Sequence, residues 1–176
     1  MNESPLGSAA LAGTSYPIDR DFVSKKLGFD KPTKNSMDGV SDRDFAVVFM
    51  SAASLIAIHL SRLAEELVIW SSDRFNFIKL PESFTTGSSI MPQKRNPDAA
   101  ELIRAKPGRI FGNMLSLMTV LKGLPMTYGK DMQEDKEPIF DTARTIQMCI
   151  VNMDGMIKGL QPIPNNMIQA LQKGFP

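Results

Sequence analysis

The chain has 176 residues, of which 43% are hydrophobic and 22% are charged, and its net charge is +1. This composition is typical of a soluble globular domain with its own core. A net charge near zero gives no electrostatic basis for binding nucleic acid or an acidic membrane surface.

The cysteine content and the apolar segments indicate where in the cell the protein is located. The single cysteine, Cys149, excludes an internal disulfide, fits a reducing environment and is expected to be a buried thiol. Residues 1–5 lack the basic and apolar regions of a signal peptide. The apolar run at residues 45–60 is interrupted by serines and by His59, and a membrane span needs roughly 20 mainly apolar residues. We therefore expect a buried helix there, with His59 packed in it, and a cytoplasmic protein without a membrane segment.

The first 35 residues predict little regular structure. Residues 4–17 are rich in small residues and lack periodicity, which is typical of an irregular segment. Asp19 is placed to cap a short helix that runs to about Lys26 and stops at Gly28. Residues 31–35 are expected to be a second connector.

A long helix is predicted from the capping-box spacing of Ser41 and Asp44 to about Ser71. Its apolar residues follow the spacing of one face: Phe45, Val48, Ala52, Leu55, Ile56, Leu60, Leu63, Leu67 and Trp70. In the first half the other faces are apolar as well, so this helix must be surrounded by other helices. One chain of this length has too few helices for that, which predicts a bundle shared between subunits.

The remaining chain predicts two more long helices. Residues 75–80 are expected to form a short extended segment, and residues 84–97 a loop without helix or strand. A capping box at residues 98–101, in which Asp98 caps and Glu101 reaches back, should open a helix that is kinked at Pro107 and ends before Gly123.

After a polar connector at residues 124–135, a helix is expected over residues 136–159 and another over residues 167–173, with a boundary at 161–166. Three helices of this length and almost no strand signal predict an all-α long-helix bundle.

The predicted loop has the sequence GSSIMPQKRNPD at residues 87–98. It leads into the positive end of a helix, and Lys94 and Arg95 add charge, so the loop is suited to hold a carboxylate or a phosphate. The pattern Gly-Ser-x-x-Met-Pro-x-Lys-x-Asn, with Glu101 five residues later, resembles the signature of the fumarase/aspartase superfamily of lyases. Several further segments resemble its argininosuccinate lyase branch: residues 5–8, 12–14, 35–38, 59–65 and 127–137.

This resemblance, which extends over residues 4–160, implies an architecture. Members are homotetramers with a central helix bundle and active sites drawn from three subunits. It implies that residues 1–162 are part of the central lyase domain and residues 163–176 the start of a C-terminal domain. Members also carry an upstream Thr-His pair that is absent here, where His59 is the only histidine. We therefore expect a fragment with little or no activity alone.

The resemblance also implies a reaction, the elimination of argininosuccinate to fumarate and arginine in arginine biosynthesis through an aci-carboxylate intermediate. Ser88 would be the base, Lys94 the cation that stabilises the aci-carboxylate, and Asn96 a donor to the substrate carboxylate. Glu101 would pair with a histidine of a neighbouring subunit. Elimination of this kind needs a base, preorganised positive charge and an acid for the leaving nitrogen.

In the motif at residues 127–137, the resemblance implies a role for Tyr128, Gln133 and Lys136. They match positions that bind the amino-acid portion of the substrate in argininosuccinate lyases. The charged residues around them would by themselves form a solvated turn. The sequence leaves open whether Arg20 and Arg43 contact the substrate, contact another subunit or do neither.

Taken singly, these residues have ordinary interpretations: Ser88 in a turn, Lys94 and Arg95 as solvated charges, Glu101 as a cap. Their joint spacing favours catalysis. Two alternatives stay open, namely another superfamily lyase (fumarase, aspartase or adenylosuccinate lyase) and a non-catalytic crystallin-like helical scaffold. No metal or organic cofactor is expected, since the sequence has no Cys/His cluster, no Gly-x-Gly-x-x-Gly and no P-loop.

Overall fold

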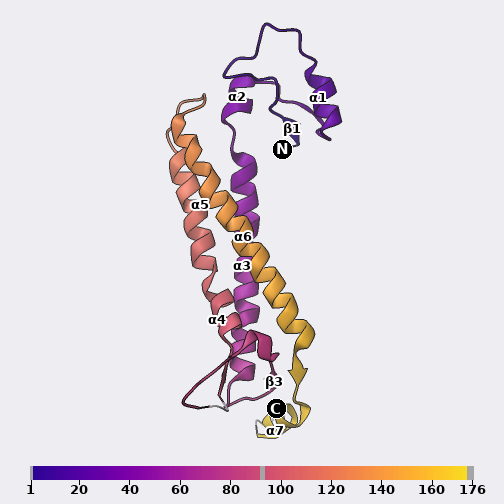
Figure 1. Ribbon diagram of the computed structural model, residues 1–176, viewed down its shortest axis with the longest axis vertical. Coiled ribbons are helices and arrows are strands. Elements are labelled where there is room, and N and C mark those ends of the chain that lie inside the picture. Colours follow the sequence, from indigo (N-terminus) through magenta and orange to yellow (C-terminus); the bar gives the residue numbers. More distant parts are fainter. Residues whose placement is uncertain (1, 92–93, 174–176) are drawn as a thin grey trace. The chain divides into compact units, whose positions relative to one another are not determined.

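The computed structural model describes residues 2–91 and 94–173, and most of these residues are helical (Figure 1). The α-helices are α1 (Arg20–Lys26), α2 (Ser36–Ser41), α3 (Asp44–Ser71), α4 (Asp98–Ala105), α5 (Pro107–Leu121), α6 (Lys136–Gly159) and α7 (Pro164–Lys173). Two short 3-10 helices are η1 (Glu82–Phe84) and η2 (Lys130–Asp135). The predicted all-α class is confirmed.

The strands are two residues long and form three separate pairs. Strand β1 (Glu3–Ser4) is parallel to β2 (Lys31–Pro32), whereas β3 (Ile78–Lys79) with β6 (Gln161–Pro162) and β4 (Thr86–Gly87) with β5 (Arg95–Asn96) are antiparallel. The extended segment predicted at residues 75–80 is confirmed in β3. The prediction that residues 84–97 contain neither helix nor strand is wrong, because η1 ends within this stretch and the pairing of β4 with β5 closes its base.

The chain divides into two compact units, Met1–Ser51 with Asn113–Phe140 and Ala52–Gly112 with Asp141–Pro176. The long helices α3, α5 and α6 each contribute residues to both. In the first unit the core lies between α3 and α5 and contains Ala46, Met50 and Leu117, all buried. The apolar face predicted for α3 is wrong in this unit, because Ala46 and Met50 do not belong to it and its members Phe45 and Val48 are exposed.

Helix α1 begins and ends where the sequence predicts. The Asp19 side chain accepts a hydrogen bond from the backbone N–H of Phe22 at 2.8 Å, and Gly28 has a φ of +79° that a residue with a side chain rarely adopts. Helix α2 was not predicted. Asn35 caps it by accepting from the N–H groups of Met37 and Asp38, within a stretch too short to show an apolar period.

The capping box predicted at Ser41 is wrong. Ser41 is the last residue of α2 and donates its hydroxyl to the carbonyl of Met37, whereas the N–H of Asp44 donates to Oδ1 of Asp42. The predicted end of α3 at Ser71 is confirmed. The start of this helix is therefore organised by the turn that joins it to α2.

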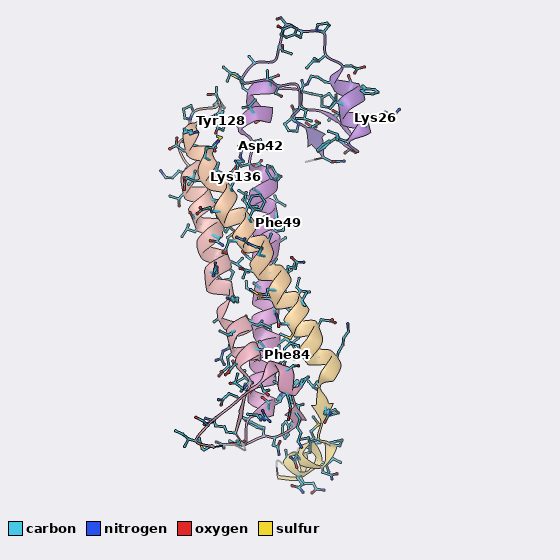
Figure 2. The ribbon with its side chains drawn as sticks, viewed as in Figure 1. Lys26, Asp42, Phe49, Phe84, Tyr128 and Lys136 are labelled. Atoms are coloured by element: carbon cyan, nitrogen blue, oxygen red, sulfur yellow. The ribbon has the colours of Figure 1, made fainter. Side chains whose placement is uncertain are left out.

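In the second unit the core lies between the C-terminal part of α3, α4 and α6. Its fully buried members include Ala64, Leu67, Ala100 and Met156, and the Phe84 ring packs against it (Figure 2). Cys149 belongs to this core, so the predicted burial of its thiol is confirmed, and burial raises the pKa of that thiol.

The capping box predicted at residues 98–101 is also wrong. Pro97 is the N-cap residue of α4 and makes no side-chain hydrogen bond there. The Asp98 carboxylate accepts instead from the hydroxyl of Thr86, across the base of the loop. The single helix kinked at Pro107 that the sequence predicts is instead two helices, because α4 ends at Ala105 and α5 begins at the proline.

Helix α6 has the predicted bounds, and α7 begins at Pro164, three residues before the predicted start. A proline fits the first turn of a helix because the missing N–H has no partner there. The proposed domain boundary after residue 162 stays a prediction.

Helix α3 is buried on one side only within this chain, so the prediction that residues 45–60 are buried holds in part. Its other faces expose large apolar side chains: Phe45, Val48, Phe49, Leu55, Ile56, Ile58 and Leu63. Among the described residues, one helix, Asp44–Ser71, is long and apolar enough to cross a membrane. Core helices of soluble proteins meet the same criteria of length and composition. His59 is exposed on this helix and is not packed as predicted.

Candidate active site

The stretch that resembles the lyase signature is a loop with a fixed base. Thr86 pairs with Asn96 and Gly87 with Arg95 in the β4–β5 ladder. The Thr86–Asp98 hydrogen bond and an ion pair of 3.2 Å between Arg95 Nη2 and Glu82 Oε1 add to this base. Pro92 and Gln93 of the predicted loop lie outside the described residues. The two ends of the loop are therefore held together just before α4.

Ser88 is the first residue after β4 and is half-buried. Its Oγ accepts hydrogen bonds from the backbone N–H groups of Ile90 and Met91, both at 3.3 Å. Ile90, which belongs to this turn, is 89% exposed. The ordinary turn interpretation of Ser88 thus describes its present contacts, which also place two N–H donors at the oxygen.

Lys94 and Asn96 lie on the returning arm of the same loop. Lys94 is exposed and its backbone N–H donates to the carbonyl of Met91 at 2.9 Å, and Asn96 is half-buried in β5. Glu101 lies in the first turn of α4, where its Oε1 is 3.8 Å from Nη2 of Arg104. The structure therefore brings Ser88, Lys94 and Asn96 into one closed loop and places Glu101 directly behind it.

A cavity of about 510 Å³ lies at the base of this loop. Arg95 and Pro97 line it together with Lys79, Asn76 and Gln161, among others, whereas neither Ser88 nor Lys94 does. The cavity is thus separate from the side chains that the sequence nominates for catalysis.

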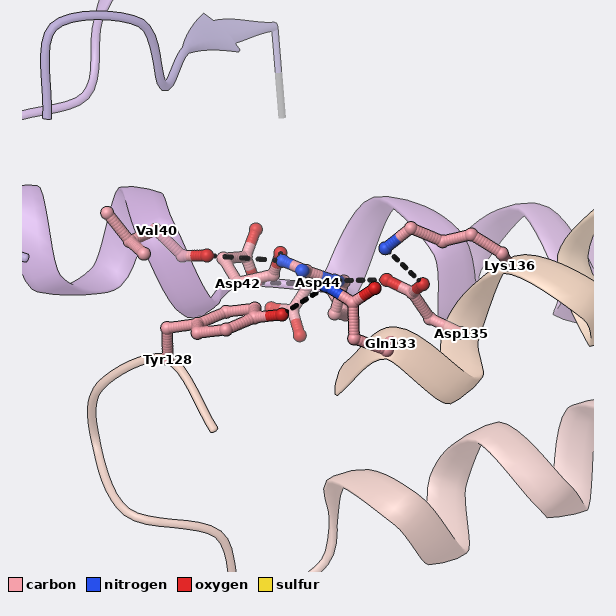
Figure 3. A network of polar contacts seen from close by, with 8 residues as sticks. Val40, Asp42, Asp44, Tyr128, Gln133, Asp135 and Lys136 are labelled. Atoms are coloured by element: carbon pink, nitrogen blue, oxygen red, sulfur yellow. Dashed lines mark hydrogen bonds and ion pairs between the residues drawn. The ribbon is translucent and has the colours of Figure 1, made fainter. Parts of the chain in front are cut away.

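The second predicted group lies in the other compact unit, at the start of α6 (Figure 3). The side-chain amide of Gln133 donates to the hydroxyl of Tyr128, and Gln133 and Lys136 are three residues apart at the end of η2. Residues spaced by three share a face of a 3-10 helix. All three predicted binding residues are exposed. The structure therefore groups Tyr128, Gln133 and Lys136 on one surface.

The sequence pattern does not single out one residue that is central to this region. Asp135 is only 3% exposed and lies between Gln133 and Lys136 in the chain. Its Oδ2 accepts from Nε of Arg43 at 2.5 Å, and its Oδ1 is 2.6 Å from Nζ of Lys136. Arg43 and Asp135 are 92 residues apart, so no spacing rule connects them.

Arg43 and Arg20 both have intramolecular roles. Nη1 of Arg43 donates to the carbonyls of Asp42 at 2.9 Å and Val40 at 3.3 Å. Arg20 donates to the Leu6 carbonyl and to two hydroxyls, and its side chain fills the space beside Gly7, where a Cβ would be 2.7 Å from Arg20 Cγ. These contacts favour a structural role for both arginines over the substrate and subunit contacts left open by the sequence.

The electrostatics of Asp135 predict an acid-sensitive fold. Burial acts to raise the pKa of Asp135, but the ion pairs with Lys136 and Arg43 outweigh it and hold the pKa below its usual value. Ionised Asp135 therefore stabilises the protein above pH ~4, the usual aspartate pKa. This contribution is lost as the pH falls through the depressed pKa.

We expect the urea midpoint of the full-length protein to fall more steeply below pH ~4 in the wild type than in Asp135→Asn. Asp131→Asn is the control, because it removes an exposed carboxylate from the same 3-10 helix. Parallel curves for the wild type and Asp135→Asn would contradict the assignment of this group.

Among the described residues, no group of three or more His, Cys, Asp or Glu side chains is arranged to hold a metal ion.

Comparison with known proteins shows which family the chain resembles. Residues 1–112 match a protein family described as lyase. The argininosuccinate lyase of Jannaschia sp. (strain CCS1) is 62% identical over 175 residues, which are 99% of this chain and 37% of that protein. A structure of EDDS lyase in complex with formate matches this chain with a TM-score of 0.79 and 34% identity. The match covers 96% of this chain and 33% of the EDDS lyase chain.

The structure of an EDDS lyase variant with bound fumarate is also similar, with a TM-score of 0.78 and 33% identity. The match covers 96% of this chain and 33% of the EDDS lyase chain. The chain thus spans little more than a third of the length of these relatives. The family match covers more than half of the chain and includes the motif at residues 87–101. This chain belongs to the lyase family.

Proposed function

We propose that the full-length protein is an argininosuccinate lyase, a carbon–nitrogen lyase that eliminates fumarate from argininosuccinate and leaves arginine. The observation that carries this proposal is the closed loop, which groups Ser88, Lys94 and Asn96 between β4 and α4. The identity of 62% with an argininosuccinate lyase over nearly the whole chain supports the choice of substrate.

The proposed reaction begins with removal of a proton from the carbon next to a carboxylate. The electron pair collects on that carboxylate as an aci-carboxylate, and the guanidinium nitrogen leaves with a proton. A free serine hydroxyl is too weak an acid to supply the base. In this loop Ser88 Oγ already accepts from two backbone N–H groups, and hydrogen bonds to the charged form of a group favour its ionisation.

Closure of the loop over the substrate would exclude water and strengthen these interactions. The Lys94 ammonium would then stabilise the aci-carboxylate, and the Asn96 amide would donate to the second carboxylate. Glu101 would hold a histidine of a neighbouring subunit. In this scheme the reaction needs neither a metal nor an organic cofactor.

The second group suits the amino-acid portion of the substrate. The Gln133 amide nitrogen donates to the phenol oxygen of Tyr128, which leaves the phenol proton for a carboxylate and the amide oxygen of Gln133 for an α-ammonium group. The Lys136 ammonium has three donors and, with one of them close to Asp135, can present others to the same carboxylate. These complementary groups favour a substrate with an α-amino acid portion, such as argininosuccinate, over a simple dicarboxylate.

The exposed apolar faces of α3 support a proposed homotetramer with active sites shared between subunits. A helix with apolar residues all round requires neighbours that this chain does not supply. We propose a cytoplasmic location and no membrane or nucleic-acid partner.

A second candidate is a lyase that releases a different amine from the same fumarate half. It is favoured by the 34% identity with EDDS lyase, a variant of which has been solved with bound fumarate. The fumarase, aspartase, adenylosuccinate lyase and crystallin-like alternatives remain as outcomes of the same test.

The test is a substrate panel on the full-length protein, with fumarate followed by its ultraviolet absorbance and arginine by chromatography. We expect equal amounts of both products from argininosuccinate and little or none from malate, aspartate, adenylosuccinate or EDDS. The 176-residue chain alone is expected to have little or no activity. Turnover of another substrate instead would reassign the enzyme, and a folded protein without any turnover would support the scaffold alternative.

A further inference from the structure

Asp135 is a buried carboxylate that lies in the chain between the exposed residues Gln133 and Lys136 (Figure 3). In η2 it is buried together with Met132, whereas Gln133 is exposed. A buried carboxylate is costly unless it is paired. Asp135 therefore depends on its partners, and its position is fixed by them.

The two cations use different oxygens of this carboxylate. Arg43 Nε donates to Oδ2 at 2.5 Å, and Lys136 Nζ is 2.6 Å from Oδ1. Arg43 is itself fixed, because its Nη1 donates to the carbonyls of Val40 and Asp42 at the end of α2. A continuous series of polar contacts thus runs from the turn between α2 and α3, through Arg43 and Asp135, to the Lys136 ammonium.

This arrangement restricts a side chain that would otherwise be mobile. A lysine side chain has four rotatable carbon–carbon bonds and three N–H donors. The Lys136 side chain is 52% exposed, and its ion pair with Asp135 holds the ammonium beside that carboxylate while donors remain for a ligand. Ordering a binding group before the ligand arrives lowers the entropy cost of binding. Anchoring η2 through Asp135 also fixes Gln133, which holds Tyr128.

We propose that Arg43 and Asp135 are positioning residues for the amino-acid-binding group Tyr128, Gln133 and Lys136, and that their ion pair sets the affinity for the α-amino acid end of the substrate. This inference rests on the proposed function. The pair touches no substrate atom and acts through Lys136 and Gln133. It therefore affects how tightly the substrate is held more than how fast the bound substrate reacts.

The test is the split between KM and kcat in the full-length protein. Asp135→Asn keeps the shape of the side chain but loses its charge, and Arg43→Lys keeps a charge that cannot contact both the carboxylate and the two carbonyls. We expect each variant to raise the KM for argininosuccinate about 10- to 100-fold, as expected for a misplaced binding group. The kcat should stay within about threefold of the wild type.

Asp141→Asn is the matched control. Asp141 forms a two-point ion pair with Arg109, at 2.7 Å and 2.5 Å, and no residue of the amino-acid-binding group lies beside either partner in the chain. This variant should weaken thermal stability and leave KM unchanged. A structural role alone would produce the same result in both aspartate variants.

The outcomes separate this inference from the proposed function. Absence of fumarate release by the wild type would overturn the function, whereas normal KM values in Asp135→Asn and Arg43→Lys with an active wild type would overturn the positioning role alone. An equal rise of KM in Asp141→Asn would overturn it as well. If Asp135→Asn does not fold, Arg43→Lys decides, and failure of both to fold would show that the pair serves the fold and not the site.

Discussion

Replacing Ser88 with alanine in the full-length protein is expected to lower kcat about 10³-fold, the contribution of a positioned general base. The KM for argininosuccinate should change little, because the proposed binding contacts come from Asn96, Tyr128, Gln133 and Lys136. The reason lies in the loop, where two backbone N–H groups point at Ser88 Oγ and would stabilise its alkoxide. Steady-state kinetics of fumarate release would measure both constants.

Ser89→Ala is the control for this change, because it removes an exposed hydroxyl one position further along the same loop. It should retain kcat within about threefold, since it leaves the proposed base in place. Circular dichroism and sedimentation would show that both variants keep the fold and the assembly. A Ser88→Ala enzyme with nearly normal kcat would require another base and would remove Ser88 from the proposed mechanism.

The parts of the fold that the sequence predicts correctly depend on local rules. The bounds of α6 follow from apolar spacing over many turns, whereas in α3 the same reasoning gives the end at Ser71 but the wrong buried face. The break before Pro107 follows from the chemistry of one residue, which has no N–H and cannot continue a helix unchanged. The cap of α1 by Asp19 needs only a neighbour three residues away.

The two incorrect capping boxes concern side chains that have a choice of partners. The capping box at Asp98 fails because Thr86, across the loop, takes its carboxylate. The box at Ser41 fails because that serine already belongs to α2. In both cases the spacing was right for a cap, but a partner outside the four-residue pattern was available. Spacing alone does not include that competition.

The candidate site shows the same division. The motifs nominate Ser88, Lys94 and Asn96, and the structure groups them because β4 and β5 pair. The Arg43–Asp135 ion pair could not be predicted, since its partners are 92 residues apart and Asp135 lies in a run of charges that looks solvated. A local pattern thus identifies the type of side chain, and the tertiary contact shows what that side chain does.

The largest expected effect on assembly comes from the exposed apolar side of α3. Leu55 is 61% exposed and Ile56 and Ile58 are exposed beside it on the same helix. In the proposed tetramer these side chains would be buried by other subunits, and burying a leucine fully is worth about 1.5–3 kcal/mol. A symmetric interface repeats each substitution in both subunits. Leu55→Arg should therefore weaken each subunit contact at least ~100-fold, since 1.4 kcal/mol is tenfold.

Sedimentation of the full-length protein over a range of concentrations would measure this loss, and fumarate release should fall with it because the proposed active sites need several subunits. Leu55→Met is the control, since it keeps apolar surface and nearly the same volume and should assemble normally. A Leu55→Arg protein that remains a tetramer would show that this side of α3 faces solvent. The apolar residues around Leu55 would then need another cover, and the shared-bundle explanation of the all-round apolarity of α3 would fail.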